Sequence, residues 1–131
     1  MKKLSKGIGI WQIINSSLVT DIIASAGFDI TIFDLEHGLH TPETIQNCLY
    51  AANSSGSLLT IARIPTHEYQ YIVQVIDTGI DGLLFPHVET KEQLDKIINL
   101  TFLYPDGNKS FSPFISRFKF GLDKKNKNNP L

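Results

Sequence analysis

The chain has 131 residues, 42% of them apolar and 19% charged, and a formal net charge of −1 at pH 7. This length and composition predict one soluble globular domain, and the small net charge gives no general attraction for nucleic acid. The single cysteine, Cys48, excludes an internal disulfide or a cysteine-based metal cluster within one chain and favours a cytoplasmic location. The apolar segment at residues 7–14 is too short to span a membrane and lacks a signal-peptide cleavage pattern, so neither feature is predicted.

The first predicted unit is a short strand at residues 8–11 followed by a helix. Ser17 is the expected N-cap of that helix, and Gly27 is its expected end because glycine readily takes the left-handed conformation. Apolar side chains at helical spacing are expected to form the buried face of the helix: Leu18, Ile22 and Ile23.

The second unit begins with a strand at residues 30–33, whose β-branched and aromatic residues suit a buried sheet. Thr41 and Pro42 then predict a helix start, since a hydroxyl can cap the helix and proline is tolerated at its first position. The expected buried stripe of this helix consists of Ile45, Cys48, Leu49 and Ala52.

The third and fourth units repeat this pattern. A strand at residues 58–63 is followed by a helix that ends at Gly79, with an apolar repeat of Tyr69, Ile72, Val73 and Ile76. A fourth strand at residues 82–85 stops at Pro86. The hydroxyl of Thr90, followed three residues later by Gln93, predicts a capping box that opens a helix carrying Leu94, Ile97, Ile98 and Phe102.

The four units together indicate an internal βα repeat. Gly27-Phe28-Asp29 before the second strand is matched by Gly79-Ile80-Asp81 before the fourth, and each unit spans roughly 22 to 28 residues, as in (β/α) barrels. The predicted fold is α/β, of the (β/α)8 TIM-barrel type, with about the first four units present. We expect residues 1–113 to form this half-barrel and residues 114–131 to be a poorly ordered, Lys/Asn-rich tail.

Three polar residues crowd the end of the second strand: Asp34, Glu36 and His37. Ligands bind at this end of parallel strands because the loops leaving it converge on one face. His37 suits a general base, although it can equally be a histidine that bonds a loop carbonyl. Asp34 and Glu36 can orient the imidazole, hold a metal-bound water or stabilise the loop.

Arg63 ends the third strand, where an unpaired guanidinium would be costly, so an anionic partner is expected. That partner is either a carboxylate or enolate substrate or a structural salt bridge to Asp34, Glu36 or Asp77.

Other residues are weaker candidates. Trp11 either lines the mouth of the site or fills the lower core, and His87 can face the cleft after the fourth strand, whereas His40 and His67 are interpreted as loop or helix-start residues. No lysine ends an apolar strand, which disfavours a Schiff-base aldolase. The glycine-rich nucleotide loops and the serine-hydrolase elbow are also missing from the sequence.

An ordered set of motifs over about residues 7–113 resembles the HpcH/HpaI aldolase family. The set consists of Ala26-Gly27-Phe28-Asp29, Phe33-Asp34-Leu35-Glu36-His37-Gly38, Ile61-Ala62-Arg63-Ile64-Pro65, Asp77-Thr78-Gly79, Pro86-His87-Val88-Glu89-Thr90 and Tyr104-Pro105-Asp106-Gly107. Each motif alone is short, and their order and spacing make the resemblance specific.

The resemblance implies a metal-dependent, class II pyruvate aldolase on a (β/α)8 barrel, which cleaves a 4-hydroxy-2-oxo acid to pyruvate and an aldehyde. It implies that His37 is the acid/base, that Asp34 supports it, and that Arg63 binds the pyruvate carboxylate or the enolate oxygen. Trp11 and His87 are expected to join Arg63 in binding the oxo-acid substrate.

The resemblance also implies a divalent metal, Mg²⁺ or Mn²⁺, held by a Glu and an Asp on later strands that would fall beyond Leu131. Within the chain Glu36 is a weak candidate ligand, and one hypothesis is that Asp34, Glu36 and His37, together with His87, hold a divalent ion and support weak lyase chemistry. The sequence departs from the family at Lys109, where an arginine is usual, and at His87, where a methionine is common. We therefore expect a truncated aldolase with little activity alone. The alternatives are a CoA-ester lyase of the citrate or malate type, and a non-catalytic half-barrel that self-associates as a homo-oligomer.

Overall fold

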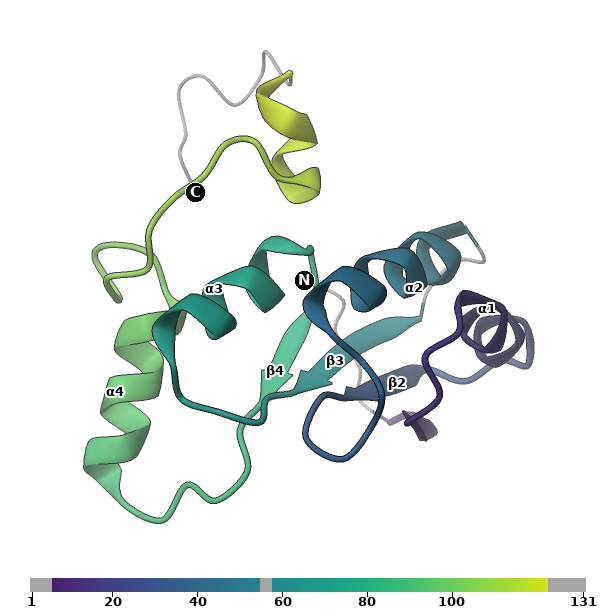
Figure 1. Cartoon of the computed structure of the whole chain (residues 1–131), viewed down its shortest axis with the longest axis horizontal. Coiled ribbons are helices and arrows are strands. Elements are labelled where there is room, and N and C mark those ends of the chain that lie inside the picture. The colour runs from purple at the N-terminus through teal and green to yellow at the C-terminus, as the bar shows by residue number, and fades with distance from the viewer. Residues whose placement is uncertain (1–5, 55–57, 123–131) are drawn as a thin grey trace.

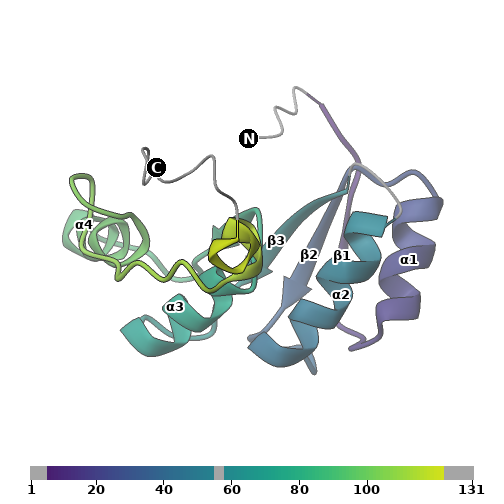
Figure 2. The same cartoon turned by 90° about the horizontal axis from the view of Figure 1, so that it is seen from above.

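The structure, a computed structural model, describes residues 6–54 and 58–122. Its centre is one sheet of four parallel strands in the order β1 (Gly9–Gln12), β2 (Ile30–Asp34), β3 (Leu59–Arg63) and β4 (Gly82–Leu84). Each strand is followed by a helix: α1 (Ser17–Ser25), α2 (Pro42–Ser54), α3 (Tyr69–Asp77) and α4 (Lys91–Thr101). Figures 1 and 2 show α1 and α2 at one end of this arrangement and α4 at the other. The predicted βα repeat is confirmed.

The alternation of side chains along the strands separates the core from the candidate site. Phe33 of β2 and Ala62 of β3 lie opposite each other in register, and both side chains are fully buried on the side of the helices. The next pair in register, Asp34 and Arg63, therefore projects from the other face of the sheet. The strand ends thus place a buried carboxylate, Asp34, and a partly exposed guanidinium, Arg63, on the face of the sheet opposite the apolar core.

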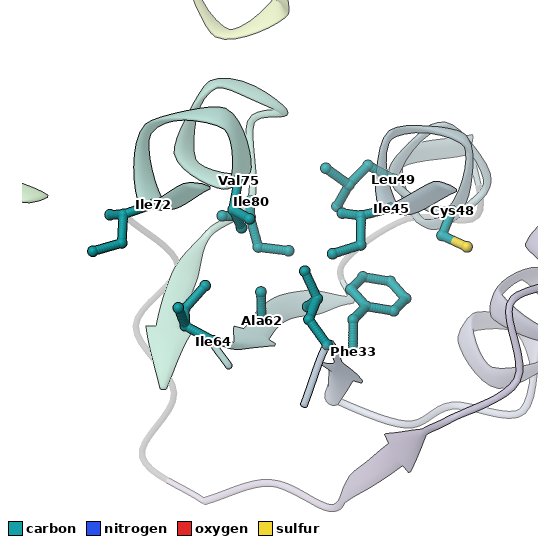
Figure 3. Close-up of a cluster of buried hydrophobic side chains, with 10 residues drawn as sticks. Phe33, Ile45, Cys48, Leu49, Ala62, Ile64, Ile72, Val75 and Ile80 are labelled. Carbon is teal, nitrogen blue, oxygen red and sulfur yellow. The ribbon is translucent and has the colours of Figure 1, made fainter. Parts of the chain in front are cut away.

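The main core lies between the sheet and the helices α2 and α3, as Figure 3 shows. Phe33 and Ala62 point from the strands toward the isoleucine, leucine and valine side chains of the two helices. The buried members of this cluster are Phe33, Leu35, Ile45, Cys48, Leu49, Ala62, Ile64, Ile72, Val75 and Ile80. All four residues of the predicted buried stripe of α2 are buried, so that prediction is confirmed.

The repeated Gly-x-Asp motifs have a structural role. Gly27 and Gly79 adopt left-handed conformations with φ of 86° and 95°, which end the preceding helices as predicted. The carboxylate of Asp29 then accepts a hydrogen bond of 2.8 Å from the Ile8 backbone N–H, and that of Asp81 accepts one of 3.0 Å from the Thr60 N–H. Each motif therefore turns the chain and ties the start of one strand to its neighbour.

The prediction for α1 was wrong in two respects. The N-cap is Ser16 rather than Ser17, and its side chain accepts a hydrogen bond from the Val19 N–H. Leu18 and Ile22 are 67% and 57% exposed instead of buried. The hydroxyl of Thr20 donates a 3.1 Å hydrogen bond to the Gln12 side chain, so a polar residue occupies the inner face that apolar periodicity assigned to leucine and isoleucine.

Helix α4 has the predicted capping box of Thr90 and Gln93, with both reciprocal hydrogen bonds formed. Its apolar stripe is less buried than predicted, because only Ile97 is buried while Leu94 and Ile98 are 47% and 38% exposed. The helix follows β4, the edge strand of the sheet, and lies at the opposite end of the molecule from α1 (Figure 2).

No helix in the two described ranges is both long and apolar enough to cross a lipid bilayer. Of the tail predicted to be poorly ordered, residues 114–122 contain a short 3-10 helix, Ser116–Gly121. Residues 123–131 lie outside the described residues, so this prediction stays a prediction.

Candidate active site

The centre of the site is an ion pair between the last residues of two adjacent strands. Nε of Arg63 donates a 2.9 Å hydrogen bond to Oδ1 of Asp34, and Nη2 of Arg63 bonds to Oδ2 of the same carboxylate. Oδ1 also accepts the backbone N–H groups of Glu36 and His37, each at 3.0 Å. Burial disfavours the ionised Asp34 carboxylate, but the hydrogen bonds from Arg63, His37 and Glu36 outweigh it and hold its pKa at about 2.

This lowered pKa predicts acid sensitivity. A carboxyl with a pKa of 3.8 when unfolded and about 2 when folded stabilises the protein fully above pH 4, and this contribution is lost as the pH falls toward 2. After allowance for solvent screening, the loss is on the order of 1–2 kcal/mol. Urea unfolding followed by circular dichroism at several pH values should show a shallower decline for Asp34→Asn than for the parent chain. If the free energy of unfolding falls with pH in parallel for the two proteins, the acid sensitivity does not come from Asp34.

Arg63 has two further neighbours. Its Nη1 atom lies 3.0 Å from Oε2 of Glu36, and its guanidinium carbon lies 4.8 Å from the centroid of the Trp11 ring, which is within cation–π range. The side chain of Arg63 remains 19% exposed. The guanidinium is thus fixed from several sides while part of it faces solvent.

Two histidines approach the same carboxylate. Nε2 of His37 lies 3.8 Å from one oxygen of Glu36, and Nε2 of His87 lies 3.4 Å from the other. The His37 side chain is 72% exposed, and Asp34 holds its backbone N–H rather than its imidazole. His87 has a left-handed backbone, with φ of 57°, three residues after the end of the fourth strand. The structure therefore gathers all the predicted site residues around Arg63 and Glu36.

The described residues do not form a set of ligands for the predicted divalent metal. Among the described residues, no cluster of three or more His, Cys, Asp or Glu side chains could hold a metal ion. Both oxygens of Asp34 are engaged by Arg63, and Glu36 faces Arg63 and the two histidines. The ligand set that a divalent cation prefers is therefore not assembled by this part of the chain.

Sequence reasoning missed the position of His40. It lies in the predicted loop, but it is only 5% exposed, and its ring packs edge-on against Phe33 with centroids 5.3 Å apart. Neither ring nitrogen has a hydrogen-bond partner among the described residues. Burial lowers the pKa of His40, against the opposing effects of the Gln12 backbone and the Asp34 charge. No periodicity marks a buried residue inside a loop, so the sequence carried no signal for it.

Gly38 lets the loop fold tightly over Asp34. A Cβ atom at this position would overlap the Asp34 carbonyl oxygen, and the backbone would have to move to relieve the overlap. We expect Gly38→Ala to destabilise the protein by about 1–3 kcal/mol and to displace His37. Thermal unfolding and the NMR signals of the His37 ring measure the two effects. Gly82→Ala is the matched control, because its Cβ would meet only Ile61, at 3.7 Å; equal effects of the two substitutions would refute the role of Gly38.

A cavity of about 640 Å³ lies between α2 and α3, away from this site. Another of about 410 Å³ opens beside the ion pair between Lys109 and Asp77, whose atoms are 2.9 Å apart. A smaller one of about 300 Å³ lies between the loops after β3 and β4 and is bordered by His67 and His87. The candidate site is therefore recognised by its side-chain chemistry and not by the size of a cavity.

Comparison with known proteins gives a consistent result. The family model described as HpcH/HpaI aldolase/citrate lyase matches residues 7–130. The hydroxypyruvate/pyruvate aldolase of Roseobacter denitrificans is 33% identical over 119 residues, which cover 88% of this chain and 46% of that enzyme. The 5-keto-4-deoxy-D-glucarate aldolase of Escherichia coli is 32% identical over 105 residues, which cover 80% of this chain and 41% of that enzyme.

The fold comparison agrees. The crystal structure of an HpcH/HpaI aldolase/citrate lyase family protein from Burkholderia cenocepacia superposes with a TM-score of 0.85 at 23% identity, over 92% of this chain and 49% of that one. The predicted partial barrel is thereby confirmed. The chain spans less than half the length of the two aldolases that it matches.

Proposed function

Since this chain belongs to the HpcH/HpaI aldolase/citrate lyase family, we propose that it carries the anion-binding and acid–base residues of a carbon–carbon lyase that forms the enolate of a 2-oxo acid such as pyruvate. One observation carries the proposal. The guanidinium of Arg63 is held in place and partly exposed, and the Glu36 carboxylate lies between it and the exposed imidazole of His37.

Arg63 binds the oxo acid in this proposal. Its contacts with Asp34 and Glu36 use three of the five N–H donors of a guanidinium, so two donors remain for a substrate carboxylate or enolate oxygen. Asp34 and the Trp11 ring hold the guanidinium in one orientation, which favours binding of a planar anion. The positive charge lies where negative charge develops when the carbon–carbon bond breaks.

His37 transfers the proton. As a general base, its imidazole removes the proton from the 4-hydroxyl group of a 4-hydroxy-2-oxo acid. The bond between C3 and C4 then breaks, C4 becomes the aldehyde carbonyl, and the electron pair passes to the pyruvate enolate. Transfer of a proton from the His37 imidazolium to C3 of the enolate gives pyruvate and restores the neutral imidazole. The hydrogen bond from the His37 backbone to Asp34 positions the loop from which this imidazole projects.

The Mg²⁺ or Mn²⁺ ion predicted from the resemblance would need ligands other than the described residues, and no step above depends on it. Binding of a metal and cleavage of a 4-hydroxy-2-oxo acid remain predictions for this protein. A CoA-ester lyase is the second candidate, because the matching family model covers citrate lyase as well as aldolases. Cleavage of an acyl-CoA in preference to a free oxo acid would favour it.

The test is exchange of the pyruvate methyl protons into deuterated water, followed by NMR, with and without added Mn²⁺ or Mg²⁺. Exchange reports enolate formation without knowledge of the aldehyde. We expect exchange that is lost in His37→Ala and Arg63→Ala and kept in His67→Ala, since His67 packs against Phe85 and not against Glu36. If the folded parent chain catalyses no exchange with or without metal, then this chain alone has no lyase activity.

A further inference from the structure

The loop at residues 35–41, which carries His37, is anchored at both ends. At its start, Oδ1 of Asp34 accepts two backbone N–H groups of the loop at 3.0 Å, one of them from His37. Near its end, the backbone N–H of Leu39 donates a 3.2 Å hydrogen bond to the Ile13 carbonyl in the loop after β1. The position of His37 therefore depends on contacts made by both halves of the loop.

His40 is the buried side chain in the second half of this loop. It is 5% exposed, whereas the neighbouring Leu39 is 78% exposed and the His37 side chain is 72% exposed. The His40 ring packs edge-on against Phe33, whose own ring points toward α2 (Figure 3). Through His40, the second half of the loop is attached to the hydrophobic core.

An imidazole is a costly group in this place. A neutral imidazole has one donor and one acceptor nitrogen, and neither nitrogen of His40 has a hydrogen-bond partner in the part of the chain that the structure describes. Burial of such polar atoms lowers stability, so phenylalanine or leucine would serve better as a purely structural residue. The property that distinguishes histidine from these residues is that it gains a charge in weak acid.

The surroundings of His40 disfavour that charge. Burial is the largest effect and lowers the pKa of His40, while the Gln12 backbone and the charge of Asp34 act in the opposite direction. The Asp34 carboxylate is already paired with the Arg63 guanidinium, so it can compensate a second positive charge only in part. A proton on His40 is therefore unfavourable while the loop is closed.

The buried polar side chains on β1, α1 and α2 are uncharged. The Thr20 hydroxyl donates a 3.1 Å hydrogen bond to Gln12, whose Nε2 atom lies 4.0 Å from the Cys48 sulfur. Burial raises the pKa of the Cys48 thiol, which keeps it protonated at neutral pH. Of the acids in the described ranges, only Asp34 is itself buried. These elements therefore supply no buried carboxylate that could neutralise a charged His40.

We propose that His40 is a positioning residue for His37 and acts only while it is uncharged. The neutral ring holds the second half of the loop against Phe33. Once protonated, the ring leaves the core for solvent and the loop opens, so that His37 loses its fixed place while the sheet stays folded. The link to catalysis rests on the proposed function, whereas the opening of the loop does not.

Amide hydrogen exchange, measured by NMR on the full chain at several pH values, tests the proposal. The open loop exposes His40, which then takes up protons with the ordinary pKa of 6.5, so opening becomes more favourable as the pH falls below that value. Between pH 7 and pH 5 we expect the protection of the His37 and Leu39 amides to fall by up to about 25-fold. This limit applies if His40 binds no proton until the loop opens. The amide of Ile64, which bonds to Leu84 within the sheet, should stay protected.

Three variants separate the charge of His40 from its packing. His40→Phe keeps a ring against Phe33 and cannot be charged, so both loop amides should be equally protected at pH 7 and pH 5. His40→Leu is the second variant if the first does not fold. His67→Gln is the matched control, because His67 packs edge-on against Phe85, with centroids 5.8 Å apart, but is only partly buried. This control should keep the pH dependence of the parent chain.

Asp34 does not contribute in this pH range, because its pKa of about 2 keeps it ionised throughout. A fall in protection of less than about twofold in the parent would overturn the proposal. So would an equal fall in His40→Phe, or an equal fall at Ile64, which would mean that the whole sheet opens. Since amide exchange needs no catalysis, failure of this proposal and failure of the lyase activity are distinguishable.

Discussion

Replacing Asp34 with alanine is expected to lower the free energy of unfolding by about 2–4 kcal/mol, because Arg63 keeps only Glu36 as a carboxylate partner and two backbone N–H groups lose their acceptor. Asp34 is 2% exposed and accepts hydrogen bonds from the Arg63 side chain and from two backbone N–H groups. The substitution therefore removes two of the contacts that orient the guanidinium and releases the loop that carries His37. Urea unfolding at neutral pH measures the stability, and methyl-proton exchange of pyruvate measures the effect on the site.

Two variants separate the contributions at this position. Asp34→Asn keeps a side-chain oxygen for the backbone N–H groups but loses the charge that faces Arg63, so we expect a smaller loss of stability than for alanine. Asp106→Ala removes an exposed carboxylate away from the site and should change stability by no more than about 0.5 kcal/mol. If Asp34→Ala is as stable as Asp106→Ala, the carboxylate does not hold the strand ends together.

Phe33→Ala is expected to cost about 3–5 kcal/mol, since it removes a buried aromatic ring and leaves a cavity that the surrounding helices fill only in part. Phe33 is fully buried in the cluster of Figure 3 and contacts the His40 ring on its other side. Chemical unfolding monitored by circular dichroism gives the stability difference. Because Asp34 follows directly in the strand, we also expect weakened exchange activity in any Phe33→Ala protein that remains folded.

Phe114→Ala is the matched control for this prediction. Its ring is 75% exposed, so its removal should change stability by less than about 0.5 kcal/mol. Phe33→Leu, which keeps most of the apolar volume, should fall between the two. A loss below about 1 kcal/mol for Phe33→Ala would mean that the cluster rearranges to fill the cavity, and the core would then not be the rigid support of the site that we infer.

Local sequence determined the elements and their ends, because the interactions involved reach only a few residues along the chain. The Thr90/Gln93 capping box, the Pro42 helix start and the left-handed Gly27 and Gly79 were each predicted from neighbouring residues, and each occurs in the structure. Strand alternation also placed Asp34 at the end of its strand. Repetition of these signals was sufficient to predict the βα order.

Tertiary structure alone decided which side chains meet. Arg63 had three candidate acidic partners in the sequence, and the parallel register selected Asp34 and Glu36 while Asp77 pairs with Lys109. Burial of His40 and exposure of Leu18 and Ile22 were likewise not predictable, since each depends on what packs opposite the residue. The physical reason is that hydrogen bonds within one turn are fixed by sequence spacing, whereas ion pairs and burial depend on segments brought together only when the sheet and its helices assemble.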